Sequence, residues 1–407
     1  MPAALIALLW LLQTPTAPAQ PSADTPSFAD TLVVTAARGE QRLVDAISPT
    51  SVLGRDELAR SPDLTLDDQL RRIPGFGLLR RSSSLTAHPT SQGVSLRGLG
   101  PSGASRTLVL LDGAPLNDPF GGWVYWDRLP LSALEAVEVA RGSLSQLYGS
   151  AAMGGAVQLL PRAPRPDTFE LTARGGDRAT RDLDVFASDA ASDGVWGYTL
   201  AGRFFATNGF YILAPGDRGA VDRRARMDFG TFFGRFERGR YHLGVNLFEE
   251  ERENGTALQR NDTSLRSLET GWSGGHWEWS AYGQSQRFHS TFSRVLADRS
   301  QEFLTADQDF PTRGYGGSAA WRSGAWLAGA DVRRAAWERQ EQTLGGIYTQ
   351  KVLGLSSRFD LLAGARLDVW ESARTRMSFN PRLGALFRAS GAVTLRGSVY
   401  RDSAPPL

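Results

Sequence analysis

Three glycines with the spacing of a phosphate-binding loop are the first candidate for chemistry in this sequence of 407 residues. Gly98, Gly100 and Gly103 form a G-x-G-x-x-G pattern, which in dinucleotide-binding enzymes leads into a helix whose N-terminus holds the pyrophosphate. Here Pro101 interrupts the loop, and the β-prone run Thr107–Leu111 follows in place of a helix. We therefore interpret these glycines as a sharp turn between two strands.

Other catalytic patterns do not emerge from the sequence. There is no G-x-S-x-G or Walker motif, and the absence of cysteine excludes disulfides and thiolate metal sites. The histidines have no H-E-x-x-H or other ligand spacing. We therefore expect a protein that is not an enzyme and that holds no cofactor or metal. The four histidines are His88, His242, His276 and His289.

Composition points to a membrane β-barrel. The 45 basic and 43 acidic side chains nearly balance, so nothing indicates a nucleic-acid partner. Glycine (44 residues) and aromatics (10%) are abundant for a soluble enzyme, and no apolar run after the N-terminus could form a spanning helix. Barrel strands alternate apolar and polar residues, which gives such a composition with moderate hydropathy.

The chain divides into four segments. The apolar run Ala3–Leu12 and the small residues Ala17-Pro18-Ala19 predict a signal peptide at 1–19, followed by a linker at 20–37. Residues 38–165 predict a mixed α+β domain, with helices in 54–62 and 64–75. Residues 166–407 predict only strands. The strands expected in the mixed domain are Val94–Leu96, Thr107–Leu111, Ala136–Ala140 and Ala156–Leu160.

Strict alternation characterises the C-terminal segment. In 241–247, Tyr241, Leu243, Val245 and Leu247 alternate with His242, Gly244 and Asn246. We expect the apolar face outside and the polar face toward a wet lumen, although a soluble sandwich alternates too. Three further features favour a barrel: an Arg- and Asp-rich polar face, aromatics at the ends of runs, and short turns alternating with long loops. Similar apolar faces are expected for Ala225, Met227, Phe229 and Phe233, and the expected girdle is Trp277, Trp321, Trp326 and Trp370.

About twelve or thirteen strands can be counted, whereas plugged transporters use roughly 22. The count predicts a partial barrel and a chain shortened at its C-terminus. The expected long loops are 207–221, 252–265, 290–311 and 372–380.

Several blocks, in order, resemble the plug domain of TonB-dependent outer-membrane receptors. They are "DTLVVTA" (Asp30–Ala36), "SLRGLG" (Ser95–Gly100), "RTLVLLDGAPLND" (Arg106–Asp118) and the glycine-rich block Leu131–Leu160. The resemblance implies an N-terminal α+β plug inside an antiparallel outer-membrane β-barrel. It also implies energised uptake of a scarce, bulky ligand such as a ferric siderophore or cobalamin, in the outer membrane of a Gram-negative-type bacterium, in contact with its lipid.

The implied partner is TonB, acting with ExbB and ExbD on the periplasmic side. A short tethered strand could pair with TonB by adding to a sheet edge; the same segment could simply be the first strand of the plug. The residues of this TonB box are Asp30, Thr31, Leu32, Val33, Val34 and Thr35.

The resemblance also assigns roles within the plug. Its structural residues are Arg97, Gly98, Asp112, Gly113, Arg141, Gly142, Tyr148, Gly149, Gly154 and Gly155. Arg97 and Arg141 are expected to pair with wall carboxylates such as Asp228, Glu278 or Asp360, or else to be solvated. Candidate ligand contacts are Ser82, Ser83, Ser84, Gln92, Asn117, Trp123, Tyr125 and Trp126, of which the three aromatics could equally pack against the wall.

Two other functions remain open at this point. One is a signalling or structural plug-barrel protein that does not transport, and the other is a passive porin or adhesin. The large N-terminal domain disfavours the porin, and no extra signalling domain fits between Gln20 and Phe28.

Overall fold

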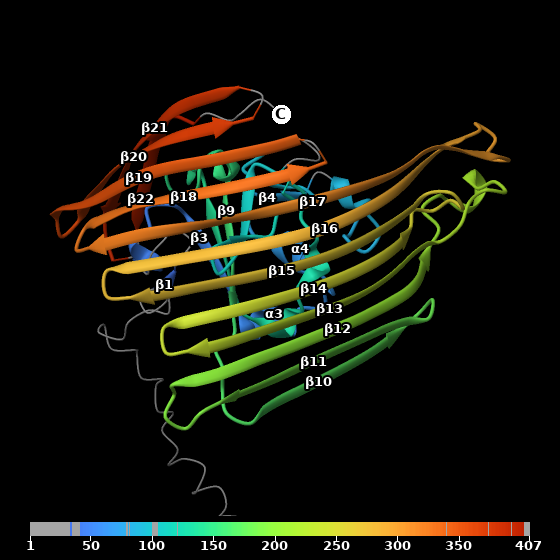
Figure 1. Ribbon diagram of the computed structural model, residues 1–407, viewed down its shortest axis with the longest axis horizontal. Coiled ribbons are helices and arrows are strands. Elements are labelled where there is room, and N and C mark those ends of the chain that lie inside the picture. The colour runs from blue at the N-terminus through green and yellow to red at the C-terminus, as the bar shows by residue number, and fades with distance from the viewer. Residues whose placement is uncertain are drawn as a thin grey trace, which may run out of the picture.

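The computed structural model describes residues 33–34, 41–78, 80, 82–99, 105–119, 121–338, 340–372, 374–391 and 393–402. The predicted signal peptide and most of the predicted linker lie outside these residues. A mixed N-terminal domain packs on one side of a curved sheet of 13 strands, which we call the wall (Figure 1). No helix within the described ranges is long and apolar enough to cross a membrane.

The N-terminal domain is built on a five-stranded sheet in the order β3-β8-β9-β6-β7. Strands β6 and β9 pair in parallel, and the other neighbours are antiparallel. Small two-stranded sheets join β1 to β2 and β4 to β5. The strands are β1 (Val33–Val34), β2 (Gln41–Arg42), β3 (Thr50–Gly54), β4 (Phe76–Leu78), β5 (Val94–Leu96), β6 (Thr107–Leu111), β7 (Ala114–Pro115), β8 (Leu134–Arg141) and β9 (Gly155–Pro161).

Helices in this domain are short. The α-helices are α3 (Arg55–Arg60), α4 (Leu66–Leu70) and α5 (Ser145–Tyr148). The 3-10 turns are η1 (Leu43–Asp45), η2 (Pro89–Ser91), η3 (Trp126–Arg128), η4 (Leu131–Ala133) and η5 (Ser150–Ala152), with η6 (Pro215–Asp217) in a wall loop.

Local sequence signals place most of these elements. Helices α3 and α4 fall inside the predicted helical ranges, and Leu66, Leu70 and Ile73 form the expected buried face. The chain then turns at Gly75, whose φ of +82° suits glycine. Each of the four predicted strands coincides with β5, β6, β8 or β9 to within two residues at either end.

The glycine pattern at residues 98–103 lies between two strands, as predicted. Arg97 and Gly98 turn at φ values of +57° and +73° directly after β5, and strand β6 follows in place of a helix. Gly100 and Gly103 lie outside the described residues. Without a following helix there is no N-terminus to bind a pyrophosphate, which excludes the dinucleotide interpretation for this loop.

The wall is a meander in which every strand pairs antiparallel with the next (Figure 1). Strands β10 and β22 form its edges. The strands are β10 (Thr168–Gly176), β11 (Thr180–Ala190), β12 (Trp196–Phe210), β13 (Ala225–Arg238), β14 (Tyr241–Glu253), β15 (Arg260–Gly274), β16 (Trp277–Val295), β17 (Glu302–Ser323), β18 (Trp326–Trp337), β19 (Gln340–Ser356), β20 (Phe359–Glu371), β21 (Thr375–Arg388) and β22 (Thr394–Tyr400).

The alternation of strand β14 is confirmed. Tyr241, Leu243 and Leu247 are exposed on the outer face, whereas Asn246 is buried toward the N-terminal domain. The expectation for β13 is wrong, because its stripe Ala225, Met227, Phe229 and Phe233 faces inward and is at most 2% exposed. The stripe packs on aromatic residues of the N-terminal domain, and Phe232 and Phe236 supply the outer apolar surface.

Two further expectations about the wall need correction. Trp277 and Trp326 are exposed on the outer face, but Trp370 is only 5% exposed and points inward. The loop expected at 290–311 is mostly strand, since β16 and β17 pair as far as Val295 and Glu302 and project beyond their neighbours (Figure 1). The loop expected at 372–380 shortens to the turn between Glu371 and Thr375.

Gly155 offers a test of the close packing in the N-terminal domain. It has φ +136°, and an added Cβ would lie 2.2 Å from the Ala140 carbonyl oxygen. Gly155→Ala should therefore destabilise the domain by about 3 kcal/mol or more, measured as the calorimetric unfolding of the detergent-solubilised chain. Gly54→Ala is the matched control, because nothing lies within 4 Å of its Cβ position. Equal stability of the two variants would contradict this account.

Candidate functional site

Inward-facing arginines of the wall hold the N-terminal domain by its backbone. Arg252 of β14 donates to the Ala87 carbonyl at 2.9 Å, and Arg203 of β12 donates to the Leu64 carbonyl at 2.9 Å. Carbonyl groups left without partners in such an interface would be costly, so each of these bonds satisfies both sides. The same pattern joins Arg333 to Tyr148 O (2.8 Å), Arg366 to Leu147 O (3.3 Å) and Arg396 to Ala46 O (2.8 Å).

Most of these arginines are already neutralised within the wall. Arg203 pairs with Asp182 at 2.8 Å, and Arg252 pairs with Glu250 at 2.7 Å. A guanidinium carries five N–H donors, so an ion-paired arginine still has donors for a partner across the interface. The wall thus offers donors without leaving an uncompensated buried charge.

Arg128 of η3 makes the reverse contact, from the N-terminal domain into the wall. Its guanidinium is buried and donates to Asn246 at 3.2 Å, Ser267 at 3.1 Å and Gln284 at 3.4 Å. All three partners are neutral. Burial therefore lowers the pKa of Arg128 to about 10, which still leaves it charged at neutral pH.

Asp127 is the most unusual group at the interface. It is 3% exposed, and neither carboxylate oxygen has a hydrogen-bond partner in the described part of the chain. Burial raises its pKa to about 7, opposed by the positive charge of Arg203 and reinforced by the negative charge of Asp67. Perturbed carboxyl groups of this kind are candidates for functional sites.

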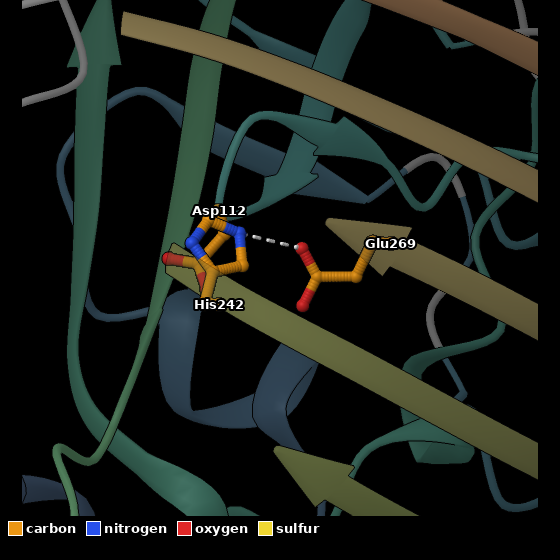
Figure 2. Close-up of side chains that lie close together, drawn as sticks. All are labelled: Asp112, His242 and Glu269. Carbon is orange, nitrogen blue, oxygen red and sulfur yellow. Dashed lines mark ion pairs between the residues drawn. The ribbon is translucent and has the colours of Figure 1, made fainter. Parts of the chain in front are cut away.

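A second polar cluster lies toward the end of the wall where the turns are short. Asp112, in the turn between β6 and β7, approaches His242 of β14 and Glu269 of β15 (Figure 2). Arg235 of β13 pairs with Asp112 as well. Desolvation raises the pKa of Asp112 to about 6. Asp112, His242 and Arg235 line a cavity of about 810 Å³ between the Asp112–Gly113 turn and the wall.

Comparison with known proteins identifies the N-terminal domain. Residues 42–156 match the family model described as TonB-dependent Receptor Plug Domain. This part of the chain is a TonB-dependent receptor plug domain. From here we call it the plug.

The whole chain shares its fold with solved receptors. It is 16% identical to the siderophore receptor PirA from Acinetobacter baumannii (TM-score 0.65, covering 88% of this chain and 61% of that one). It is 15% identical to a mutant of the ferric enterobactin receptor PfeA from Pseudomonas aeruginosa (TM-score 0.65, covering 88% of this chain and 62% of that one). It is 15% identical to the ferric yersiniabactin uptake receptor FyuA from Yersinia pestis (TM-score 0.60, covering 86% of this chain and 64% of that one). The chain thus spans less than two thirds of the length of each of these receptors.

Of the aromatic ligand candidates, two are buried between plug and wall. Tyr125 is 2% exposed with its ring centroid 5.9 Å from that of Phe248, and Trp126 is 4% exposed, 6.2 Å from Phe76. Because their surfaces are already covered, packing rather than ligand contact accounts for both. Trp123 is half-buried beside Phe288 of β16 and remains a candidate.

Three polar ligand candidates are committed to internal hydrogen bonds. The Ser84 hydroxyl donates to Asp67 at 2.7 Å, Gln92 donates to Ala87 O at 3.1 Å, and Asn117 bridges Val109, Thr107 and Gly122. Ser82 and Ser83 therefore remain as the polar candidates.

The segment of the plug that carries these serines reaches the ends of β14–β16 where β16 projects beyond its neighbours. His88 lies 3.2 Å from Asn261 of β15, and its ring packs against Phe292 of β16. Burial lowers the pKa of His88 to about 4, so it is neutral at physiological pH.

The expected pairing of Arg97 and Arg141 with Asp228 or Asp360 is wrong. Arg141 donates to Pro74 O at 2.8 Å and to the Ser51 hydroxyl at 3.0 Å, both within the plug. Asp228 instead pairs with Arg226, and Asp360 with Arg388. Glu278 lines the 810 Å³ cavity beside Asp112. Asp228 is thus paired within its own strand β13 and Asp360 with the neighbouring strand β21, so both carboxylates that we expected to serve the plug have partners in the wall.

The other expected structural residues of the plug occupy turns and close contacts. Positive φ values occur at Gly98, Asp112, Gly113, Gly142, Gly149 and Gly155. A Cβ on Gly154 would lie 3.1 Å from Thr107 Oγ1, and Tyr148 accepts from Arg333 through its carbonyl. These positions set the path of the backbone.

Only part of the predicted TonB box can be placed. Val33–Val34 forms β1, which pairs antiparallel with Gln41–Arg42 of β2. Asp30, Thr31, Leu32 and Thr35 lie outside the described residues.

Sequence reasoning missed the central pair Asp127 and Arg128. A signal was present, because two adjacent charges stand in the otherwise apolar and aromatic run "WVYWDRLPL" (Trp123–Leu131). Charged residues inside such a run are either solvated or buried with partners. Three partners of Arg128 are wall side chains, and the fourth is the Leu116 carbonyl of the same domain, so only the folded structure distinguishes the two.

Asp127 predicts a specific pH dependence. Because its pKa is raised, Asp127 keeps its proton in the folded state, whereas the unfolded chain releases that proton near pH 4. The free energy of unfolding therefore falls as pH rises from about 4 to 7. Asp127→Asn has no carboxyl to ionise, so its stability should not fall in this way. It should be more stable than wild type at pH 8 by up to about 4 kcal/mol, with little difference at pH 4. Calorimetric unfolding across this range measures it.

The exposed acid Asp56 of α3 provides the control. Asp56→Asn should follow the wild-type pH profile. If Asp127→Asn follows it too, Asp127 is not a buried proton-holding group.

Proposed function

We propose that this chain acts in TonB-dependent uptake of a bulky ligand through an outer membrane, as a transport receptor and not an enzyme. The observation that carries the proposal is the plug at 42–156, seated against the polar inner face of a 13-stranded antiparallel wall. Because a plug blocks passive diffusion, such an arrangement serves a receptor whose plug is moved by supplied work.

The outer surface of the wall supports a position in the outer membrane. Large apolar side chains are exposed there from the edge strand β10 to β21, including Phe169 (68%), Met377 (65%) and Leu383 (60%). Exposed apolar surface on this scale is unfavourable in water and suits contact with lipid.

The partner that we propose is TonB, acting with ExbB and ExbD. Within the described ranges, strand β1 pairs with β2 alone, which leaves its other edge for an incoming strand. Addition of a strand from TonB to this edge would supply main-chain hydrogen bonds that resist pulling. The proposed box remains residues 30–35.

The proposed cargo is a ferric siderophore, cobalamin or a similarly bulky ligand. PirA, PfeA and FyuA are named for siderophores or their ferric complexes, which favours the siderophore class. Ser82, Ser83 and the half-buried Trp123 are the contacts that we carry forward.

A signalling or structural role without transport is the alternative. It predicts no dependence on residues 30–35. A passive porin or adhesin is disfavoured, because the plug forms hydrogen bonds with the inner face of the wall from β12 to β21.

Proline substitution tests the TonB segment. Val33→Pro removes a backbone donor from β1 and should abolish binding of the purified C-terminal domain of TonB, measured by calorimetry, together with energised uptake. Gln41→Pro is the matched control, since it disrupts the β1–β2 pairing but leaves residues 30–35 intact. Normal binding by Val33→Pro, or loss of binding in both variants, would contradict the assignment.

A further inference from the structure

We propose that Asp112, His242 and Glu269 form a binding site for a divalent transition-metal ion that joins the plug to the wall. One ligand atom from each of the three residues lies within 4.8 Å of the others. Asp112 comes from the plug, whereas His242 and Glu269 come from neighbouring wall strands (Figure 2). Sequence spacing gives no hint of this group.

The register of β14 and β15 makes room for the two wall ligands. His242 stands opposite Gly271, and Glu269 stands opposite Gly244. A Cβ on Gly244 would lie 2.0 Å from Glu269 Oε1, and a Cβ on Gly271 would lie 2.5 Å from His242 Cε1. The side chains of His242 and Glu269 thus each occupy space beside a glycine that a larger residue would fill. This brings the imidazole and the carboxylate together.

Two buried atoms of this group make longer ion-pair contacts but no hydrogen bond among the described residues. Glu269 is 7% exposed, and neither its Oε1 nor His242 Nε2 has a hydrogen-bond partner among the described residues. His242 Nε2 lies 3.3 Å from Glu269 Oε2. Buried polar atoms without partners are rare in folded proteins and require an explanation such as an ion.

The local charge also favours a dication. Asp112, Glu237 and Glu269 surround Arg235, which contacts Asp112 and lies 2.7 Å from Glu237 and 3.7 Å from Glu269. Three carboxylates against one guanidinium leave two negative charges among these four side chains. Each carboxylate has two oxygens, so Arg235 can keep one while an ion takes the other.

The donor set indicates the class of ion. One imidazole nitrogen with two carboxylate oxygens suits Zn²⁺ and its first-row neighbours, whereas Mg²⁺ and Ca²⁺ prefer oxygen ligands alone. The 810 Å³ cavity that Asp112 and His242 line gives an entry path and room for water as a fourth ligand. The ion would bridge the β6–β7 turn of the plug to β14 and β15, and so restrain plug movement.

Calorimetric titration of the untagged, detergent-solubilised full chain with Zn²⁺ tests the site. We expect one tight site, weakened at least roughly 10- to 100-fold in His242→Ala, Glu269→Gln and Asp112→Asn. His289→Ala is the matched control, because His289 contacts two carboxylates, Asp262 and Asp307, in an exposed position. Unchanged binding in His242→Ala, or loss in His289→Ala alone, would overturn the proposal.

Two readouts separate metal binding from damage to the fold. Zn²⁺ should raise the unfolding temperature of the wild-type plug but not that of Glu269→Gln, since only a site of the folded state stabilises by mass action. Gly244→Ala leaves all three ligands in place, yet its Cβ displaces Glu269, so it should weaken Zn²⁺ binding as well. A Gly244→Ala chain that binds Zn²⁺ as wild type does would contradict the geometry. None of these measurements depends on TonB or on cargo.

Discussion

The need to satisfy buried arginines on the inner face of the wall governs how plug and wall fit together. An unpaired charge in such an interface is strongly unfavourable, so Arg203 and Arg252 are first paired with wall carboxylates. Their remaining donors meet plug carbonyls. The plug thus contributes backbone carbonyls to these contacts, whereas Arg128, Asp112 and Asp45 are plug side chains that bring charge to the wall.

Hydrogen bonds of this kind suit an interface in which the plug must be held by the wall and also be able to separate from it. A hydrogen bond exchanged for water contributes only about 1 kcal/mol net, so many such bonds can be replaced one at a time. The apolar part consists of several clusters: an aromatic one joins Tyr125 to Phe205, Phe229 and Phe248 of β12–β14, and others reach β17–β21. Separation of such a cluster exposes apolar surface at once and is more costly. The apolar clusters are therefore the firmer part of the contact, and the hydrogen bonds of the arginines are the part that is more easily exchanged.

Local patterns allowed much of the fold to be predicted. The apolar spacing of α4, the turn glycines and the β-prone runs concern residues that are near one another in the chain, so the sequence was sufficient for them. The alternation of β14 was predicted correctly for the same reason. The assignment failed for β13 and for Trp370, because an apolar residue suits an aromatic plug surface as well as lipid, and periodicity does not say which neighbour is present.

The candidate site was predictable only in part. The resemblance located the plug and its glycine turns, but the partners of Arg141, Asp127 and Arg128 are set by contacts between segments more than 50 residues apart, or by their absence. The sequence by itself determined which strands alternate and where the plug chain turns, since both follow from local sterics and side-chain period. Only the tertiary structure decided which face meets the plug, which charges are buried, and that Asp112, His242 and Glu269 converge, because strand register brings distant residues together.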